Sequence, residues 1–110
     1  MGMLPERDVT RLRHIQAACD RVSTYTADGR ASLDDDRTYE AVLHCLMIIG
    51  EALGALSNDA YAKLPSLPAS APAAMRNIIV HEYWRVETDA VWKTISRDLP
   101  ALRADIEALG

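Results

Sequence analysis

Apolar residues recur at steps of three and four along most of this chain, the spacing that places side chains on one face of an α-helix. The first such stripe is formed by Val9, Leu12, Ile15, Cys19 and Val22. The arginines and the aspartate of this segment fall largely off the stripe, as expected for a helix with one buried face. Asp28-Gly29 is expected to end this helix, because glycine adopts the positive φ angle that a C-terminal cap favours.

The second segment begins after a run of serine and aspartate at residues 32–36, whose side chains can cap a helix N-terminus. The pattern predicts a helix from about Thr38 to Leu56 that is apolar on nearly all sides from Ala41 onward. Such a helix is central and packs against neighbouring helices or a second subunit. His44 is therefore expected in the core or at an interface.

The remainder of the chain predicts one connector and two further helices. Residues 58–63 are expected to form a short helical turn, and three prolines make Leu64–Pro72 a stiff connector. A third long helix is expected to start near Ala73, with Pro72 in its first turn. In the last helix Pro100 is expected to cause a kink or brief break. Its apolar stripe is formed by Val91, Ile95, Leu99, Leu102 and Ile106.

These elements predict one all-α domain over residues 1–110, an up-and-down bundle of four main helices. The chain has 110 residues, of which 12 are Lys or Arg and 16 are Asp or Glu, so its formal net charge is −4. This charge argues against broad, non-specific coating of nucleic acid and requires any contact with phosphates to come from a local cluster. We expect two free, buried thiols at Cys19 and Cys45, and no membrane span or export signal. The expected location is the cytoplasm.

The segment from Met75 to Trp84 gathers polar side chains that could perform chemistry: Arg76, Asn77, His81, Glu82 and Tyr83. Histidine exchanges a proton near neutral pH, and the planar arginine fork matches phosphate oxygens. These groups suit metal-independent RNA cleavage, in which the ribose 2′-hydroxyl attacks the adjacent phosphate. The residues alone leave the alternative open that His81 is structural and that Arg76 forms a surface ion pair.

The same segment carries a family resemblance. Arg76-Asn77-Ile78-Ile79-Val80-His81-Glu82-Tyr83 resembles the R-x4-6-H-x-Y signature of the HEPN superfamily, in the version found in HepT-like toxins. Upstream, Ile49-Gly50-Glu51-Ala52 resembles the "IGEA" segment of the family's central helix. Downstream, residues 86–95 followed by Asp98-Leu99-Pro100 resemble its C-terminal helix. With these flanks, the resemblance covers most of residues 7–108.

The resemblance implies an all-helical homodimer with a composite ribonuclease site, and no metal or other cofactor. Arg76 and His81 would be catalytic, with Asn77 supporting them, and the substrate would be tRNA or mRNA. It also implies a partner, an MntA-type minimal nucleotidyltransferase antitoxin that transfers AMP to the tyrosine of the motif, here Tyr83. A bulky anionic group at Tyr83 would occlude RNA and repel its phosphates.

Two alternatives remain open at the level of the sequence. Glu51 either contacts Arg76 or His81 as a supporting residue, or is exposed on an imperfectly buried helix face. The protein is alternatively a non-catalytic HEPN module that binds a nucleotide or partners a nucleotidyltransferase, or a plain dimeric bundle for protein interaction.

Overall fold

The computed structural model describes residues 2–67 and 88–110, and these residues form an all-α bundle without any strand. Helix α1 (Glu6–Tyr25) is followed by the 3₁₀ turn η1 (Gly29–Asp34), helix α2 (Asp36–Ala55) and the short helix α3 (Asn58–Tyr61). The last described segment contains α5 (Thr88–Lys93), a π-helical turn η2 (Thr94–Asp98) and α6 (Leu99–Glu107). The predicted third long helix begins outside the described residues.

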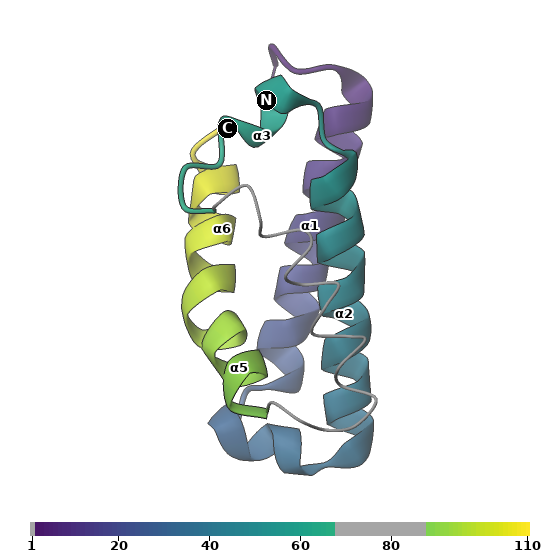
Figure 1. Ribbon diagram of the computed structural model, residues 1–110, viewed down its shortest axis with the longest axis vertical. Helices are drawn as coiled ribbons and strands as arrows, with labels where there is room; N and C mark the ends of the chain where they lie inside the picture. Colours follow the sequence, from purple (N-terminus) through teal and green to yellow (C-terminus); the bar gives the residue numbers. More distant parts are fainter. Residues whose placement is uncertain (1, 68–87) are drawn as a thin grey trace.

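The described helices run up and down along one axis. Helix α1 is antiparallel to both α2 and the α5–α6 segment, and both chain ends lie near α3 at one end of the bundle (Figure 1). Helix α1 contacts both α2 and α6. No helix within residues 2–67 and 88–110 has the length and apolar character needed to cross a bilayer.

Both predicted apolar stripes lie in the core. Four of the five stripe residues of α1 are buried, and Val9 at its start is half-buried. The whole stripe of the last segment is buried, from Val91 to Ile106. These two stripes pack with the buried side of α2, which includes Val42, Leu46 and Ile49, into one cluster. Burial of this apolar surface is the main source of stability in such a bundle.

The end of α1 differs from the prediction. The helix stops at Tyr25, not at Asp28-Gly29, and Thr26 follows it with a side-chain hydroxyl that donates to the Val22 carbonyl at 2.7 Å. Such a local side-chain bond satisfies a carbonyl at the helix end. Gly29 does have a positive φ of 83°, but it opens the η1 turn and donates its N–H to the Thr26 carbonyl.

The start of α2 confirms the predicted capping run. Asp35 accepts hydrogen bonds from both the N–H and the hydroxyl of Thr38, each at 2.9 Å. These bonds favour the ionised carboxylate and lower the pKa of Asp35 below its usual value. The negative charge also complements the positive end of the α2 dipole.

Helix α2 has one outward face that the apolar pattern concealed. Its exposed residues include Glu40, His44, Glu51 and Ala55, which are spaced by four, seven and four positions and so share one face. His44 is therefore not a core residue, and only its expected place at an interface stays a prediction. The pattern misled because Ile48, which is only half-buried, lies among these residues.

The predicted disturbance near Pro100 takes the form of the π turn. The Leu99 N–H bonds to the Thr94 carbonyl five residues earlier, and Pro100 then falls in the first turn of α6. Proline is tolerated there because the first N–H groups of a helix have no partner within it. The wider turn accommodates Pro100 while Ile95 and Leu99 both remain buried.

Two aspartates hold the segment around α3 against the bundle by accepting hydrogen bonds from serines. Asp8 on α1 accepts from the N–H and the hydroxyl of Ser57, which caps α3. Asp105 on α6 accepts from the N–H and the hydroxyl of Ser66, both at 2.9 Å. The chain is thus anchored at residues 57 and 66, shortly before it leaves the described region.

Candidate functional site

Most of the predicted site lies outside the described residues. Arg76, Asn77, His81 and Tyr83 all belong to residues 68–87. Glu51 is the one predicted site residue that the structure describes. The structure therefore describes the surroundings of Glu51.

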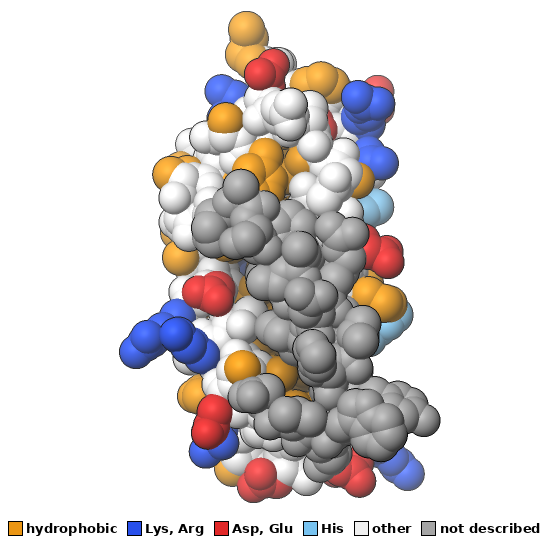
Figure 2. Space-filling view, viewed as in Figure 1, with side chains coloured by type: hydrophobic (Ala, Val, Ile, Leu, Met, Phe, Trp, Pro, Cys, Tyr) orange, Lys and Arg blue, Asp and Glu red, His pale blue; other side chains and the backbone are white. Residues whose placement is uncertain are grey.

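Glu51 lines a groove between α1 and α2. The groove has a volume of about 470 Å³ and takes Thr10, Arg11 and His14 from α1. Helix α2 contributes Ile48, Glu51, Ala52 and Ala55. Along the right-hand edge of Figure 2, over α2, histidine, acidic and hydrophobic side chains follow one another. The groove thus combines a cation, an imidazole, a carboxylate and an apolar strip.

The charged groups of this groove are not paired with each other. The Arg11 Nη1 donates to the Arg7 carbonyl one turn earlier, at 3.4 Å, which is the one hydrogen bond that this guanidinium forms with the described part of the chain. Within residues 2–67 and 88–110 neither Arg11 nor Glu51 takes part in an ion pair. Glu51 is exposed, so its carboxylate does not bear the cost of burial that the apolar sequence around it suggested.

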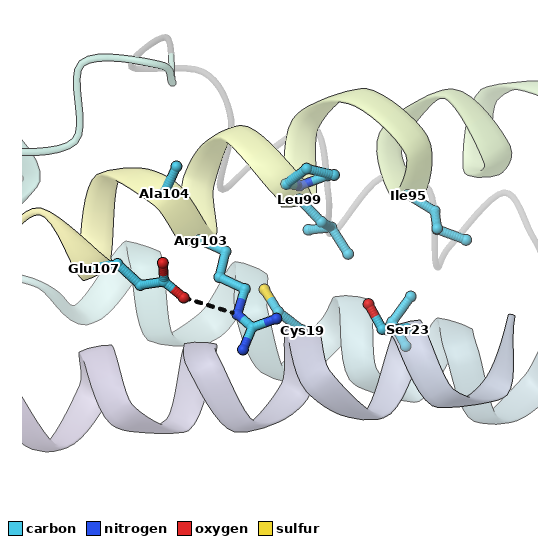
Figure 3. A pocket seen from close by; sticks show the side chains of 9 residues that line it. Cys19, Ser23, Ile95, Leu99, Arg103, Ala104 and Glu107 are labelled. Atoms are coloured by element: carbon cyan, nitrogen blue, oxygen red, sulfur yellow. Dashed lines mark ion pairs between the residues drawn. The ribbon is translucent and has the colours of Figure 1, made fainter. Parts of the chain in front are cut away.

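A second hollow, of about 280 Å³, lies between α1 and the η2–α6 segment (Figure 3). Arg103 of α6 lies beside Cys19 in Figure 3. Its guanidinium forms ion pairs with Asp20 at 2.7 Å and with Glu107 at 3.5 Å. Burial raises the pKa of the Cys19 thiol to about 12, which keeps it protonated at neutral pH. In this hollow Arg103 is therefore engaged in ion pairs, and Cys19 supplies no thiolate nucleophile at neutral pH.

The two cysteines of the chain are buried thiols of the core. Cys19 and Cys45 are both free and buried, as the sequence predicted. Burial raises the pKa of Cys45 as well. In the described ranges, no three His, Cys, Asp or Glu side chains come together as a metal-binding group.

Sequence reasoning did not single out Arg11 or His14. Both lie on α1, three residues apart and therefore on neighbouring positions of one face, with Arg7 a further turn away. That spacing was a usable signal. The closeness of Arg11 and His14 to Glu51 on α2 could not be predicted from the sequence, because it depends on how the two helices pack.

Comparison with known proteins defines the class of the chain. The family model described as "Ribonuclease HepT-like" matches residues 15–109. The chain therefore belongs to this family, and the resemblance predicted from the residue 76–83 motif and its flanks is confirmed. The all-α fold and the assignment to HEPN-type ribonucleases are confirmed at the level of the family.

Three curated relatives show how far the similarity extends. "Probable ribonuclease HepT" of Thermococcus cleftensis is 38% identical over 77 residues, which cover 70% of each chain. "Putative RNase MJ0125" of Methanocaldococcus jannaschii is 28% identical over 109 residues, 96% of this chain and 94% of the relative. "Putative RNase TTE0752" of Caldanaerobacter subterraneus is 32% identical over 69 residues, 63% of this chain and 62% of the relative. No solved structure matches the chain.

Proposed function

We propose that the chain is a metal-independent endoribonuclease toxin whose chemistry is performed by Arg76 and His81. The observation that carries this proposal is the family match, which spans residues 15–109 and so includes the complete Arg76–Tyr83 motif. The printed names of the three relatives, each of which contains the word ribonuclease or RNase, agree with it. The substrate is a cellular RNA, either tRNA or mRNA.

The proposed reaction uses the substrate's own 2′-hydroxyl as nucleophile. His81 accepts the proton of this hydroxyl while its oxygen attacks the adjacent phosphorus. The bond from phosphorus to the 5′-oxygen breaks, the leaving oxygen takes up a proton from water, and His81 returns its proton to the solvent. The products are a 2′,3′-cyclic phosphate and a 5′-hydroxyl end. Arg76 stabilises the charge that develops on the phosphate oxygens, and Asn77 orients the imidazole or a substrate oxygen.

Two copies of the chain form the active unit in this proposal. The Arg76 and His81 side chains of the two protomers face one shared cleft, which concentrates arginine around the RNA in spite of the net charge of −4. A minimal nucleotidyltransferase silences this toxin by transferring AMP from ATP to the hydroxyl of Tyr83, with release of pyrophosphate. Binding of that antitoxin adds a second means of control.

The test is expression of the chain in a bacterial host, followed by mapping of new RNA ends. The wild type is expected to arrest growth and to generate ends carrying a cyclic phosphate. His81→Ala and Arg76→Ala are expected to abolish both effects at equal protein level. Arg13→Ala serves as the matched control, because Arg13 is an exposed arginine of α1 that does not line the groove.

Each possible result bears on the proposal. Arrest with intact RNA, or arrest that persists in His81→Ala, would contradict the catalytic assignment. Neither arrest nor cleavage by the wild type would favour the non-catalytic module that partners a nucleotidyltransferase. Loss of cleavage in Arg13→Ala as well would show that the assay responds to any lost positive charge.

A further inference from the structure

Within residues 2–67 and 88–110, the charged groups of the groove between α1 and α2 form no ion pair. One wall consists of Thr10, Arg11 and His14, all of which carry hydrogen-bond donors. The other wall is apolar except for Glu51. A volume of about 470 Å³ lies in the range of sites that hold small organic ligands.

We infer that this groove binds one nucleotide unit of the RNA substrate, with its phosphate on Arg11 and its nucleoside against α2. The inference deepens the proposed function and rests on it, because it assigns RNA-holding residues that are not part of the Arg76–Tyr83 motif. None of Thr10, Arg11 or His14 belongs to that motif.

The donor wall suits a phosphate group. Arg11 presents a planar fork with five N–H donors, of which one contacts the Arg7 carbonyl. Thr10 and His14 are exposed and lie four residues apart, on the same side of α1 as neighbours one turn from each other. A phosphate between these side chains would receive hydrogen bonds from up to three residues on one rigid helix.

The opposite wall suits a nucleoside. Ile48 and Ala52 are half-buried and Ala55 is exposed, so they form an apolar strip against which a base can lie. Glu51 lies on the same wall and can accept hydrogen bonds from base amino groups. Its negative charge also disfavours a second phosphate inside the groove, which limits the site to one nucleotide.

An RNA strand fits this surface better than a free nucleotide does. Arg7 is exposed one turn before Arg11, on the same face of α1, and so continues the line of donors beyond the groove. A strand has a further phosphate to place there, whereas a free mononucleotide has none. In a chain of net charge −4, such a local line of cations is where phosphate binding can occur.

The experiment measures binding separately from cleavage. The full chain is titrated into a fluorescently labelled single-stranded RNA whose 2′-hydroxyls are replaced by fluorine, so that cleavage cannot occur. Arg11→Gln is expected to weaken binding by about tenfold, the effect of losing one charged hydrogen bond. It is also expected to reduce the slope of log affinity against log salt by about 0.7, the value for one phosphate contact on a single strand. Arg13→Gln, the exposed control on the same helix, is expected to bind like the wild type.

The outcomes distinguish this inference from the proposed function. Unchanged binding in Arg11→Gln, equal weakening in both variants, or no binding by the wild type would overturn the groove assignment. AMP is titrated in parallel with the RNA. If Arg11→Gln weakened the binding of AMP but left the binding of RNA unchanged, the RNA strand would be overturned as the occupant. Cleavage of unmodified RNA is measured on the same wild-type preparation. If Arg11 matters for binding but no cleavage occurs, the groove stands and the ribonuclease proposal fails.

Discussion

Asp8 and Ser57 form a two-bond contact that joins the beginning of α1 to the end of α2. The Ser57 N–H donates to one carboxylate oxygen of Asp8 at 3.0 Å, and the Ser57 hydroxyl donates to the other at 2.7 Å. The same hydroxyl oxygen accepts from the Ala60 N–H at 3.2 Å and so caps α3. Asp8 is completely buried and lies in the first turn of α1, where the helix dipole favours a negative charge.

This contact predicts an acid-sensitive contribution to stability. The bonds from Ser57, and more weakly the charges of Arg7 and Arg11, hold the pKa of Asp8 below its ordinary value of 3.8. The stabilisation by Asp8 is therefore complete above pH 3.8 and is lost as the pH falls through the lower pKa of the folded state. Asp8→Asn is expected to lower the free energy of unfolding at pH 7, because the amide cannot accept both bonds.

Urea unfolding followed by circular dichroism, at pH 7 and at several acid pH values, measures this effect. The difference in the free energy of unfolding between Asp8→Asn and the wild type is expected to become smaller as Asp8 of the wild type becomes protonated. Asp28→Asn is the matched control, since Asp28 is exposed and its side chain caps nothing. Equal and pH-independent effects of the two variants would contradict the role given to Asp8.

A second prediction concerns the thiol of Cys19. With its pKa raised to about 12 by burial, Cys19 at pH 8 has roughly a thousandfold fewer thiolates than a free cysteine. Iodoacetamide is expected to label it only slowly in the folded protein and readily in urea, as read by peptide mass spectrometry. Ser23→Cys provides an exposed comparison on the same helix. Native Cys19 that reacts as fast as this comparison would show that α6 does not cover it as described.

The predictable part of the fold is the part set by local periodicity. The stripe from Leu12 to Val22 and the stripe from Val91 to Ile106 determine which helix faces are buried, and the structure confirms both. Asp35 capped α2 as expected because capping needs only a neighbour three residues away. The end of α1 was predicted too far along the chain, at Gly29. No residue pattern indicated the hydrogen bond from Thr26 to the Val22 carbonyl as strongly as the glycine indicated a helix end.

The unpredicted part depends on contacts between distant segments. Arg11 and Glu51 are separated by 40 positions and line one groove only because α1 and α2 pack side by side. The sequence did not indicate the outward face of α2, because Ile48 and Ala52 are apolar although they line a groove. Arg76 and His81 were selected by their spacing and by a family motif, and their role stays a prediction.

A third prediction follows from the composite site. Sedimentation equilibrium at micromolar concentration is expected to give twice the chain mass of 12.1 kDa. In the proposed dimer, catalytic groups from two protomers act on one RNA, so cleavage is also expected to fall steeply on dilution below the dimer dissociation constant. A monomer that cleaves RNA at unchanged specific activity would exclude a composite centre. His81→Ala serves as the control for dimerisation without catalysis.

The last prediction tests the control of activity through Tyr83. Co-expression with the minimal nucleotidyltransferase is expected to relieve growth arrest by the wild type and to add the mass of AMP to the peptide containing Tyr83. Tyr83→Phe keeps the aromatic ring but removes the hydroxyl acceptor, so it is expected to stay toxic and to escape relief. Tyr25→Phe, at an exposed tyrosine of α1, is expected to behave like the wild type. Equal relief of Tyr83→Phe and the wild type would show that the antitoxin acts by binding, and the AMP-transfer account would then be wrong.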